Sequence, residues 1–247
     1  MKSKMITTTP RVIVCTPTRN RRWTMDFSVA CMGAQTLQPD LWIVVDNSTS
    51  PEEDWSILSR PNLYYEHVEG DRPVGWMRNR CLDLALERSA DYILFWDDDD
   101  YYPPMRIERG VRALETSDAD LAGCSRMFIL LIQENAMMTT GPFHDAHATA
   151  ATYTIRAEYA RRNRFNEEKR RGEELEFTKE WKAKMKQLVP EETIVVMSHG
   201  KNTVDKSPLL KHPRLYMAEM VNDVNGKQVF RSRWPVQWDL FRRTFSV

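Results

Sequence analysis

Short apolar runs bounded by turn signals alternate with amphipathic stretches through about the first 130 residues of the chain. This alternation is typical of βαβ units, and it predicts an α/β fold with a mostly parallel central sheet flanked by helices. The apolar runs predict strands at residues 11–16, 41–45, 62–67 and 91–96.

Two helices are predicted by apolar positions that recur at helical spacing. One covers residues 74–88, and the other begins near Pro103 and Pro104, since proline suits the first turn of a helix. The first apolar stripe consists of Met77, Cys81, Leu84 and Ala85, and the second helix runs through Ile107, Val111 and Leu114.

The pattern changes in the second half of the chain. Residues 119–132 and 148–155 are rich in Ile, Leu, Thr and Tyr and predict strands, with a loop at 135–147 between them. Residues 156–187 are highly charged and helix-favouring, interrupted by Gly172, and a short strand is predicted at 193–197. Residues 205–247, anchored by Trp234, Trp238 and Phe241, predict a C-terminal extension.

The composition is that of an ordinary globular protein, with 247 residues and an apolar fraction of 42%. Its apolar runs are far shorter than the ~20 residues that cross a bilayer. The first ten residues lack the apolar stretch of a secretory signal, so we expect a cytoplasmic protein without a membrane partner. The four cysteines are far apart and predict neither a zinc site nor a disulfide framework.

The formal net charge of +0 conceals an asymmetry along the chain. Residues 1–155 hold 15 Lys and Arg against 22 Asp and Glu, whereas residues 156–247 hold 20 against 13. Such a division points to a cation site on one face and an anionic partner on the other.

The most informative motif is the run of four aspartates, 97–100, that closes the apolar stretch 92–95. Adjacent carboxylates repel one another, and a hard cation such as Mg²⁺ or Mn²⁺ relieves that repulsion. In an extended segment Asp97 and Asp99 share one face, while Asp98 and Asp100 point away. A parallel strand that ends in acids places them at the sheet edge where open α/β folds bind ligands. The alternative interpretation is a solvated acidic turn.

Four segments in this order resemble the GT-A glycosyltransferases, specifically the family-2 group of nucleotide-sugar transferases. They are the turn at residues 16–20, the strand that ends in Asp46 and Asn47, the helix start at Arg78, and the acidic run 97–100. The resemblance covers roughly residues 10–200 and implies a GT-A (Rossmann-like) domain over residues 1–204. Within it, residues 10–132 would bind the nucleotide-sugar, and residues 133–204 would bind the acceptor and supply the catalytic base.

The resemblance also implies roles for matching residues. Asp46 matches the acid that hydrogen-bonds the nucleotide base, usually uracil, with Asn47 in place of a second acid. Arg78 matches an arginine that reaches the nucleotide, while Asp97 and Asp99 match the two acids of the DxD metal motif. A UDP-sugar donor and bound Mn²⁺ or Mg²⁺ follow from these matches. Further donor-binding residues implied are Thr16, Pro17, Arg19 and Asp98.

Transfer of a sugar also requires a base that takes the proton of the acceptor hydroxyl, and backside attack then inverts the anomeric centre. Residues 172–177 resemble the Gly-Glu-Asp segment of the family. This resemblance implies that the carboxylate of Glu174 is the catalytic base, with Glu173 as its substitute. His199 lies in a segment similar to His-Gly-x-Asn-Thr and would complete the metal shell. Acids at a helix N-terminus are the alternative interpretation of residues 173–176. A second, less favoured metal interpretation combines His144, Asp145 and His147.

The acceptor is the least constrained part of the prediction. Residues 156–186 combine cations with aromatic side chains, as a phosphate backbone and an exposed base require. Similar transferases in phages decorate 5-hydroxymethylpyrimidines, so hydroxymethylated DNA is one predicted acceptor and a saccharide or glycan is the other. A solvated helix pair would show the same pattern. The predicted acceptor-binding residues are Arg161, Arg162, Arg164, Arg170, Trp181 and Lys182, with Lys182 and Lys186 on one helical face.

Three further interpretations bear on the class of protein. Residues 230–234 partly resemble the QxxRW motif of processive polysaccharide synthases, but Phe230 replaces the glutamine, which favours transfer of a single sugar. A non-catalytic nucleotide-sugar or nucleic-acid binding module would keep the acidic strand end for folding alone. A nucleotidyltransferase would also set acids around Mg²⁺, but would release pyrophosphate.

Overall fold

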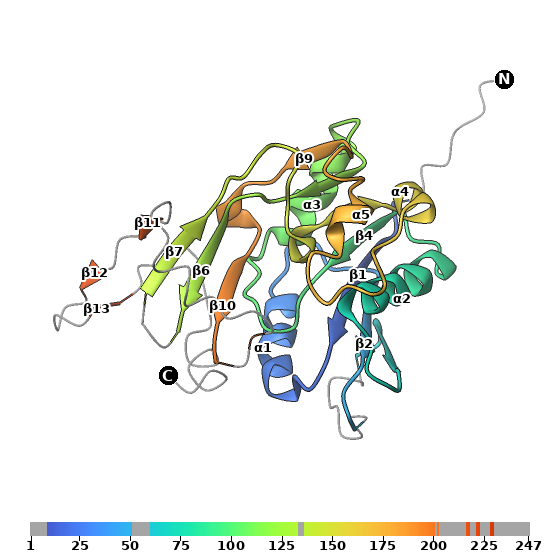
Figure 1. The fold of residues 1–247 in the computed structure, drawn as a ribbon, viewed down its shortest axis with the longest axis horizontal. Helices are drawn as coiled ribbons and strands as arrows, with labels where there is room; N and C mark the ends of the chain where they lie inside the picture. Colours follow the sequence, from blue (N-terminus) through green and yellow to red (C-terminus); the bar gives the residue numbers. More distant parts are fainter. Residues whose placement is uncertain are drawn as a thin grey trace.

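The computed structural model describes residues 9–50, 60–132, 136–200 and 202, together with short strands at 216–217, 221–222 and 228–229. The described residues form a central sheet of seven strands in the order β3-β2-β1-β4-β8-β5-β9 (Figure 1). All neighbours are parallel except that β8 runs antiparallel to β4 and β5. The strands are β1 (Val12–Thr18), β2 (Leu41–Asp46), β3 (Leu63–His67), β4 (Tyr92–Phe95), β5 (Leu121–Gly123), β8 (Thr154–Arg156) and β9 (Met185–Gln187).

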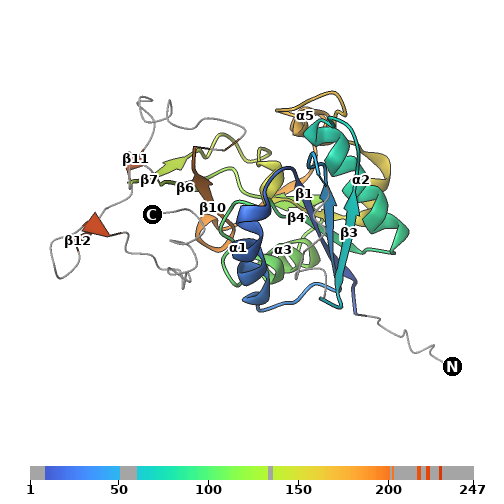
Figure 2. The same cartoon turned by 90° about the horizontal axis from the view of Figure 1, so that it is seen from below.

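Helices cover both faces of this sheet, and Figure 2 shows α1 and α3 on one side with α2 on the other. Because side chains alternate along a strand, Val12 and Val14 of β1 join the core under α1 and α3, whereas Ile13 and Cys15 join the core under α2. The helices are α1 (Arg22–Gly33), α2 (Val74–Glu87), α3 (Arg106–Glu115), α4 (Ala157–Arg162) and α5 (Glu174–Phe177).

A second sheet lies beside the first, in the order β10-β6-β7-β11 (Figure 1). The acidic run joins the two sheets: Tyr101 forms a bridge with Val195, and Asp100 Oδ1 accepts a hydrogen bond of 2.9 Å from the Met197 amide. The strands are β6 (Met127–Leu131), β7 (Ala136–Thr140), β10 (Val195–Ser198) and β11 (Tyr216–Met217), with β12 (Val221–Asn222) and β13 (Gln228–Val229) paired separately.

The predicted α/β class and parallel sheet are confirmed, as are the four strands and the helix at 74–88 in the first half. Several boundaries differ. Residues 119–132 form two strands in two sheets, α3 begins at Arg106, and β7 occupies part of the predicted loop 135–147. Both sheets draw strands from either side of residue 132, so the two proposed parts of the domain interleave.

The prediction of helix over most of residues 156–187 is wrong. Only α4 and the single turn of α5 are helical, and β9 joins the central sheet. Buried Phe165 and Phe177 stack with ring centroids 4.1 Å apart, and this packing takes precedence over the local helix propensity of the charged residues. Lys182 and Lys186 therefore share no helical face, because Lys186 lies in β9.

A turn of unusual backbone geometry follows α5. Lys179, Glu180 and Trp181 have φ angles of 53°, 54° and 63°, three consecutive non-glycine residues in the left-handed region. Each such residue costs roughly 1–2 kcal/mol relative to a right-handed conformation. Tertiary contacts of residues 175–183 must therefore hold this turn in place.

No helix in the described ranges has the length and apolar character of a membrane span. Of the predicted C-terminal extension, the structure describes the strand pairing of β11 with β7 and of β12 with β13. The predicted QxxRW-like segment 230–234 and the anchors Trp234, Trp238 and Phe241 lie outside the described residues.

Candidate active site

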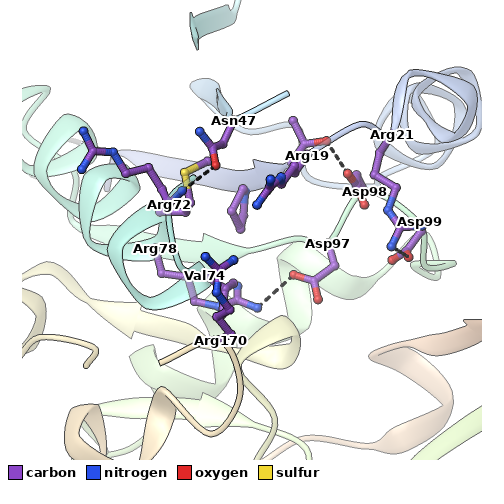
Figure 3. A pocket seen from close by; sticks show the side chains of 13 residues that line it. Arg19, Arg21, Asn47, Arg72, Val74, Arg78, Asp97, Asp98, Asp99 and Arg170 are labelled. Carbon is purple, nitrogen blue, oxygen red and sulfur yellow. Dashed lines mark hydrogen bonds and ion pairs between the residues drawn. The ribbon is translucent and has the colours of Figure 1, made fainter. Parts of the chain in front are cut away.

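The carboxyl ends of β1, β2 and β4 meet the start of α2 around one open pocket of about 290 Å³ (Figure 3). Acidic and basic side chains face each other across it, which suits a ligand that carries both a cation and phosphate groups. The residues that line it are Pro17, Thr18, Arg19, Arg21, Asn47, Arg72, Val74, Met77, Arg78, Asp97, Asp98, Asp99 and Arg170.

The four aspartates occupy a turn, and the extended alternation predicted for them is not found. Asp97, Asp98 and Asp99 all line the pocket, whereas buried Asp100 accepts the Met197 amide and thus holds β10. Asp98 is buried and accepts a hydrogen bond from Thr18 Oγ1. The amide of Asp97 donates to Tyr102 Oη at 2.7 Å, which fixes the backbone of the turn.

Arg78 connects the acidic turn to the predicted catalytic segment, as Figure 3 shows for Asp97. Its Nη2 lies 3.2 Å from Asp97 Oδ1, and its Nε lies 3.0 Å from Glu173 Oε1. Burial alone would lower the pKa of Arg78, but Asp97 and then Glu173 outweigh it and the net shift is upward. The third nitrogen, Nη1, is buried without a hydrogen-bond partner among the described residues. The guanidinium therefore has a donor to offer to a ligand in the pocket.

A close approach of two segments makes this contact possible. The loop after α4 lies against the start of α2, where a Cβ on Gly75 would stand 1.8 Å from the Asn166 carbonyl oxygen. Asn79 of α2 holds the same loop, since its side chain accepts from the Phe165 amide and donates to the Phe165 carbonyl, both at 2.9 Å. A glycine at position 75 thus allows Glu173 to reach Arg78.

Asp99 lies among polar partners on the far side of the turn. Its Oδ2 is 3.0 Å from His199 Nε2, 3.3 Å from Asn202 Nδ2 and 3.6 Å from Arg21 Nη2. Arg21 Nη1 is buried without a partner in the described part of the chain. Asp99 and His199 therefore come together as predicted, while Asp97 is turned to Arg78.

These residues fit a divalent cation of the kind that shares its ligands with a substrate. The described ranges contain no group of three or more His, Cys, Asp or Glu side chains placed to hold a metal. Mg²⁺ characteristically binds through one or two carboxylates plus substrate phosphates. Asp99 could supply one carboxylate, together with either His199 or the carboxylate of Asp97. Burial raises the pKa of Asp97, Arg78 opposes the rise, and repulsion from Asp99 adds to it. A cation would relieve that repulsion.

Asp71 joins two arginines that line the pocket. It forms an ion pair with Arg19 and another, at 2.6 Å, with Arg170. Hydrogen bonds from Arg170 and then Arg19 lower the pKa of this exposed carboxyl. Loops before α1, α2 and α5 are thereby linked over one side of the pocket. Arg170, a predicted acceptor-binding residue, therefore lines the pocket of the acidic turn.

Two predicted donor-binding residues lie elsewhere. Asp46 lines an adjoining cavity of about 420 Å³, with its carboxylate bound by Ser48 and by the Tyr65 hydroxyl at 2.9 Å. Its neighbour Asn47, just after the end of β2, lines the pocket of the acidic turn instead, and its side chain is hydrogen-bonded to the Arg72 amide and the Val68 carbonyl. Thr16 is fully buried, and its hydroxyl accepts the Trp42 indole N–H at 2.9 Å, so it lines neither cavity.

Glu173 and Glu174 differ in their surroundings. The buried Glu173 carboxylate is engaged by Arg78, whereas Glu174 is half-buried at the first position of α5. Burial raises the pKa of Glu174, and the Glu173 carboxylate adds to the rise. The pKa of Glu174 is thus shifted in the direction that suits a general base or acid.

Five cations of the predicted basic surface form ion pairs with acids. The exposed side chain of Arg161 extends from α4, and Trp181 packs against two histidines that are described below. The pairs are Arg162 with Glu158, Arg164 with Asp83, Arg170 with Asp71, Lys182 with Glu180, and Lys184 with Asp118.

Sequence reasoning missed Arg21, Arg72 and Asp71. Arg21 follows the turn at residues 16–20 and lies near Asp99, but no local pattern distinguishes it from other surface arginines. The amide of Arg72 donates to the Asn47 side chain at 2.9 Å, a contact between segments 25 residues apart. Asn202, which contacts Asp99, could have been found from the sequence, because it belongs to the His-Gly-x-Asn-Thr segment.

Comparisons with known proteins agree with this geometry. The profile of glycosyl transferase family 2 matches residues 13–187, more than half of the chain. A search among curated proteins finds no match.

Two solved structures share the fold at low sequence identity. Residues 1–349 of S. aureus TarS, in complex with UDP-GlcNAc, are 18% identical with a TM-score of 0.60, over 78% of this chain and 60% of that one. The mannosyltransferase PcManGT from Pyrobaculum calidifontis, in complex with GDP-Man and Mn²⁺, is 16% identical with a TM-score of 0.56, over 79% and 59%. The chain thus spans about three-fifths of each of these structures.

Proposed function

The chain belongs to glycosyl transferase family 2, and we propose that it is a metal-dependent inverting transferase that moves one sugar from a UDP-sugar to an acceptor hydroxyl. One observation carries the proposal: buried Arg78 contacts Asp97 of the acidic turn and Glu173 beside the candidate base. Donor and base residues are therefore adjacent. The uridine donor is supported by the UDP-GlcNAc complex of TarS.

On the donor side, arginines receive the leaving group. Negative charge grows on the diphosphate as its bond to the anomeric carbon lengthens. Arg78 and Arg21 each have a buried N–H group without a partner in the described ranges, and both side chains line the pocket. Preorganised donors of this kind stabilise the developing charge without reorganising during the reaction.

Asp99 and His199, with Asp97, would hold Mg²⁺ or Mn²⁺ beside the diphosphate. The bound cation supplies Lewis-acid stabilisation of the departing phosphate. The Mn²⁺ and GDP-Man complex of PcManGT supports a divalent cation at such a site.

Glu174 is the base in this proposal. Glu173 is held by Arg78 and serves to position that guanidinium, which leaves Glu174 to accept the proton of the acceptor hydroxyl. Its carboxylate acts from the face of the sugar opposite the diphosphate, so that the anomeric centre inverts.

For the acceptor, the ion pairs favour a saccharide over hydroxymethylated DNA. Paired cations such as Arg164 with Asp83 and Lys182 with Glu180 produce little of the positive field that a phosphate backbone needs. Hydroxymethylated DNA remains the second candidate because exposed pairs are weak and can exchange partners.

The test compares Glu174→Gln with Glu176→Gln, an exposed acid of the same helix turn. We expect UDP binding in the presence of Mn²⁺, measured by calorimetry, to be the same in both variants and the wild type. Sugar transfer from UDP-sugars should fall by about 10²–10⁴-fold in Glu174→Gln only, the loss expected of a missing general base.

Four outcomes would contradict parts of the proposal. Absence of metal-assisted UDP binding in the wild type would remove the donor assignment. Full activity of Glu174→Gln would remove the base. UDP binding without turnover of any sugar donor would identify a binding module, and release of pyrophosphate would identify a nucleotidyltransferase.

A further inference from the structure

Four aromatic side chains form a cluster outside both cavities. Phe143, His144, His147 and Trp181 contact one another through their rings, and we call them the aromatic shelf. Ring centroids are 4.8 Å apart for Phe143 and His147, 4.6 Å for His147 and Trp181, and 5.9 Å for His144 and Trp181. Phe143 is 60% exposed, the largest exposure of any large apolar side chain in the described ranges. The Phe143 ring is thus available to a ligand, while His147 and Trp181 beside it are half-buried.

Hydrogen bonds from neighbouring strands hold the shelf. Ser125 Oγ accepts the Phe143 amide at 2.8 Å and lies 3.2 Å from His147 Nδ1. Gln187 Nε2 donates to the carbonyls of Asp145 and His147, both at 2.8 Å. Burial and the neighbouring His144 lower the pKa of His147, which disfavours the charged form of its ring. The hydrogen bonds make the shelf a fixed surface.

The second side of the shelf is the turn of left-handed residues 179–181. The Glu180 amide donates to the Leu175 carbonyl at 2.8 Å, and Lys182 donates to the Thr178 carbonyl at 3.0 Å. These contacts maintain a conformation that L-residues rarely adopt, and the result is that Trp181 faces His144 and His147. Backbone outliers kept by their surroundings are frequent at ligand sites.

Two chain segments join the shelf to the candidate base. The turn that carries Trp181 is attached to the end of α5, a single helical turn that begins at Glu174. On the other side, burial and then the charge of Glu174 raise the pKa of Tyr153, whose hydroxyl donates at 2.9 Å to the carbonyl of Ala148, next to His147. The shelf is therefore connected to Glu174 through both of the chain segments that form it, the one with Trp181 and the one with His147.

We propose that the aromatic shelf is the acceptor subsite, on which a sugar ring of a neutral saccharide stacks with a hydroxyl directed to Glu174. The proposal rests on the transferase function proposed above. The C–H face of a pyranose ring complements the negative face of an aromatic ring, while its edges remain free to bond polar groups at the rim. Lys182 and Lys184, which follow Trp181 in the chain, are paired with Glu180 and Asp118, which reduces the positive charge offered to a ligand on the shelf.

The experiment measures binding of neutral disaccharides (cellobiose, maltose, lactose and diacetylchitobiose) to the full chain by saturation-transfer NMR. We expect at least one to bind the wild type, and Trp181→Ala to weaken that binding on the order of tenfold through loss of the stacked face. Trp181→Phe should restore it to within about threefold, since a flat ring returns. The left-handed backbone is equally strained in all three proteins.

Tyr64→Ala is the matched control, because Tyr64 is a half-buried aromatic residue on the opposite edge strand β3. It should leave disaccharide binding unchanged. UDP binding with Mn²⁺ should be equal in every variant, so a wild type that fails to bind UDP refutes the donor proposal separately from the shelf. The shelf proposal is overturned if no disaccharide binds or if Trp181→Ala binds as the wild type does. It is also overturned if a hydroxymethylated single-stranded oligonucleotide binds through Trp181 in place of a saccharide.

Discussion

Arg78 is the side chain on which the geometry of the donor pocket depends most. Its guanidinium lies 4.9 Å above the Phe95 ring and between the carboxylates of Asp97 and Glu173. A buried charge pair gains little net stability over an apolar replacement, but removal of one partner leaves the other charge buried and unpaired. The two ion pairs therefore hold the carboxylates of Asp97 and Glu173, which are distant in sequence, at the guanidinium of Arg78.

We expect Arg78→Met to lower the free energy of unfolding by about 3–5 kcal/mol, because Glu173 would remain buried without its partner. Arg162→Met removes an exposed pair with Glu158 and should change the same quantity by less than about 1 kcal/mol. Urea unfolding measures both. A similar small loss in the two variants would show that the Arg78 contacts do not support the fold.

The pH dependence of transfer follows from Glu174. Its pKa is raised above the ordinary value of 4.5 by burial first and by Glu173 second. A base must be deprotonated, so kcat/KM should fall as pH decreases through this raised pKa, with an acid limb above 4.5. The contribution of Glu174 to the free energy of unfolding changes in the opposite sense. Because its pKa is higher in the folded state, this contribution is largest below the pKa of the unfolded state and decreases as pH rises through the pKa of the folded state.

Glu173→Gln tests the assignment of this limb. Gln keeps an oxygen for Arg78 but removes the charge that raises the Glu174 pKa, so the acid limb should move to lower pH. A limb that stays in place, or moves upward, would assign the titration to another group.

Among the loops, the link formed by Asp71 controls access of anions to two arginines. Because Arg19 and Arg170 line the pocket and both pair with Asp71, a diphosphate must compete with this carboxylate for them. We expect Asp71→Asn to tighten UDP binding by roughly twofold to fivefold at low salt and by less at high salt. Titration calorimetry at two ionic strengths measures the effect.

Asp118→Asn serves as the control for the Asp71 variant. It removes another exposed carboxylate whose partner is Lys184, and neither residue lines the pocket. UDP binding should not change. Weaker binding in Asp71→Asn would mean that the carboxylate positions the two arginines rather than competing for them.

The elements themselves were predictable to different degrees. Buried strands such as β1 and β4 and the amphipathic helix α2 follow from local periodicity, because one apolar face or run specifies each of them. Residues 156–187 could not be predicted in this way. Their charges favour helix locally, whereas burial of Phe165 and Phe177 and the pairing of β9 with β5 decide the conformation.

At the level of the whole molecule, topology brings the site together. Parallel β1, β2 and β4 end at the same edge, so the acids and turns that follow them converge although they are far apart along the chain. The antiparallel strand β8 lies between β4 and β5, and the chain after it returns to place Glu173 against α2. The second sheet then delivers His199 to Asp99 through β10.

The order of strands, acids and helix starts along the chain was sufficient to specify the α/β class, the family and an acidic run at the end of β4, because apolar periodicity and motif order are properties of the sequence itself. Packing alone determined that Arg78 pairs with Glu173, that Asn47 rather than Asp46 faces the acidic turn, and that several cations of residues 156–186, such as Arg164, are ion-paired. It also determined that Trp181 lies on His147. These relations join residues tens of positions apart, and no local pattern encodes which distant partner a side chain will meet.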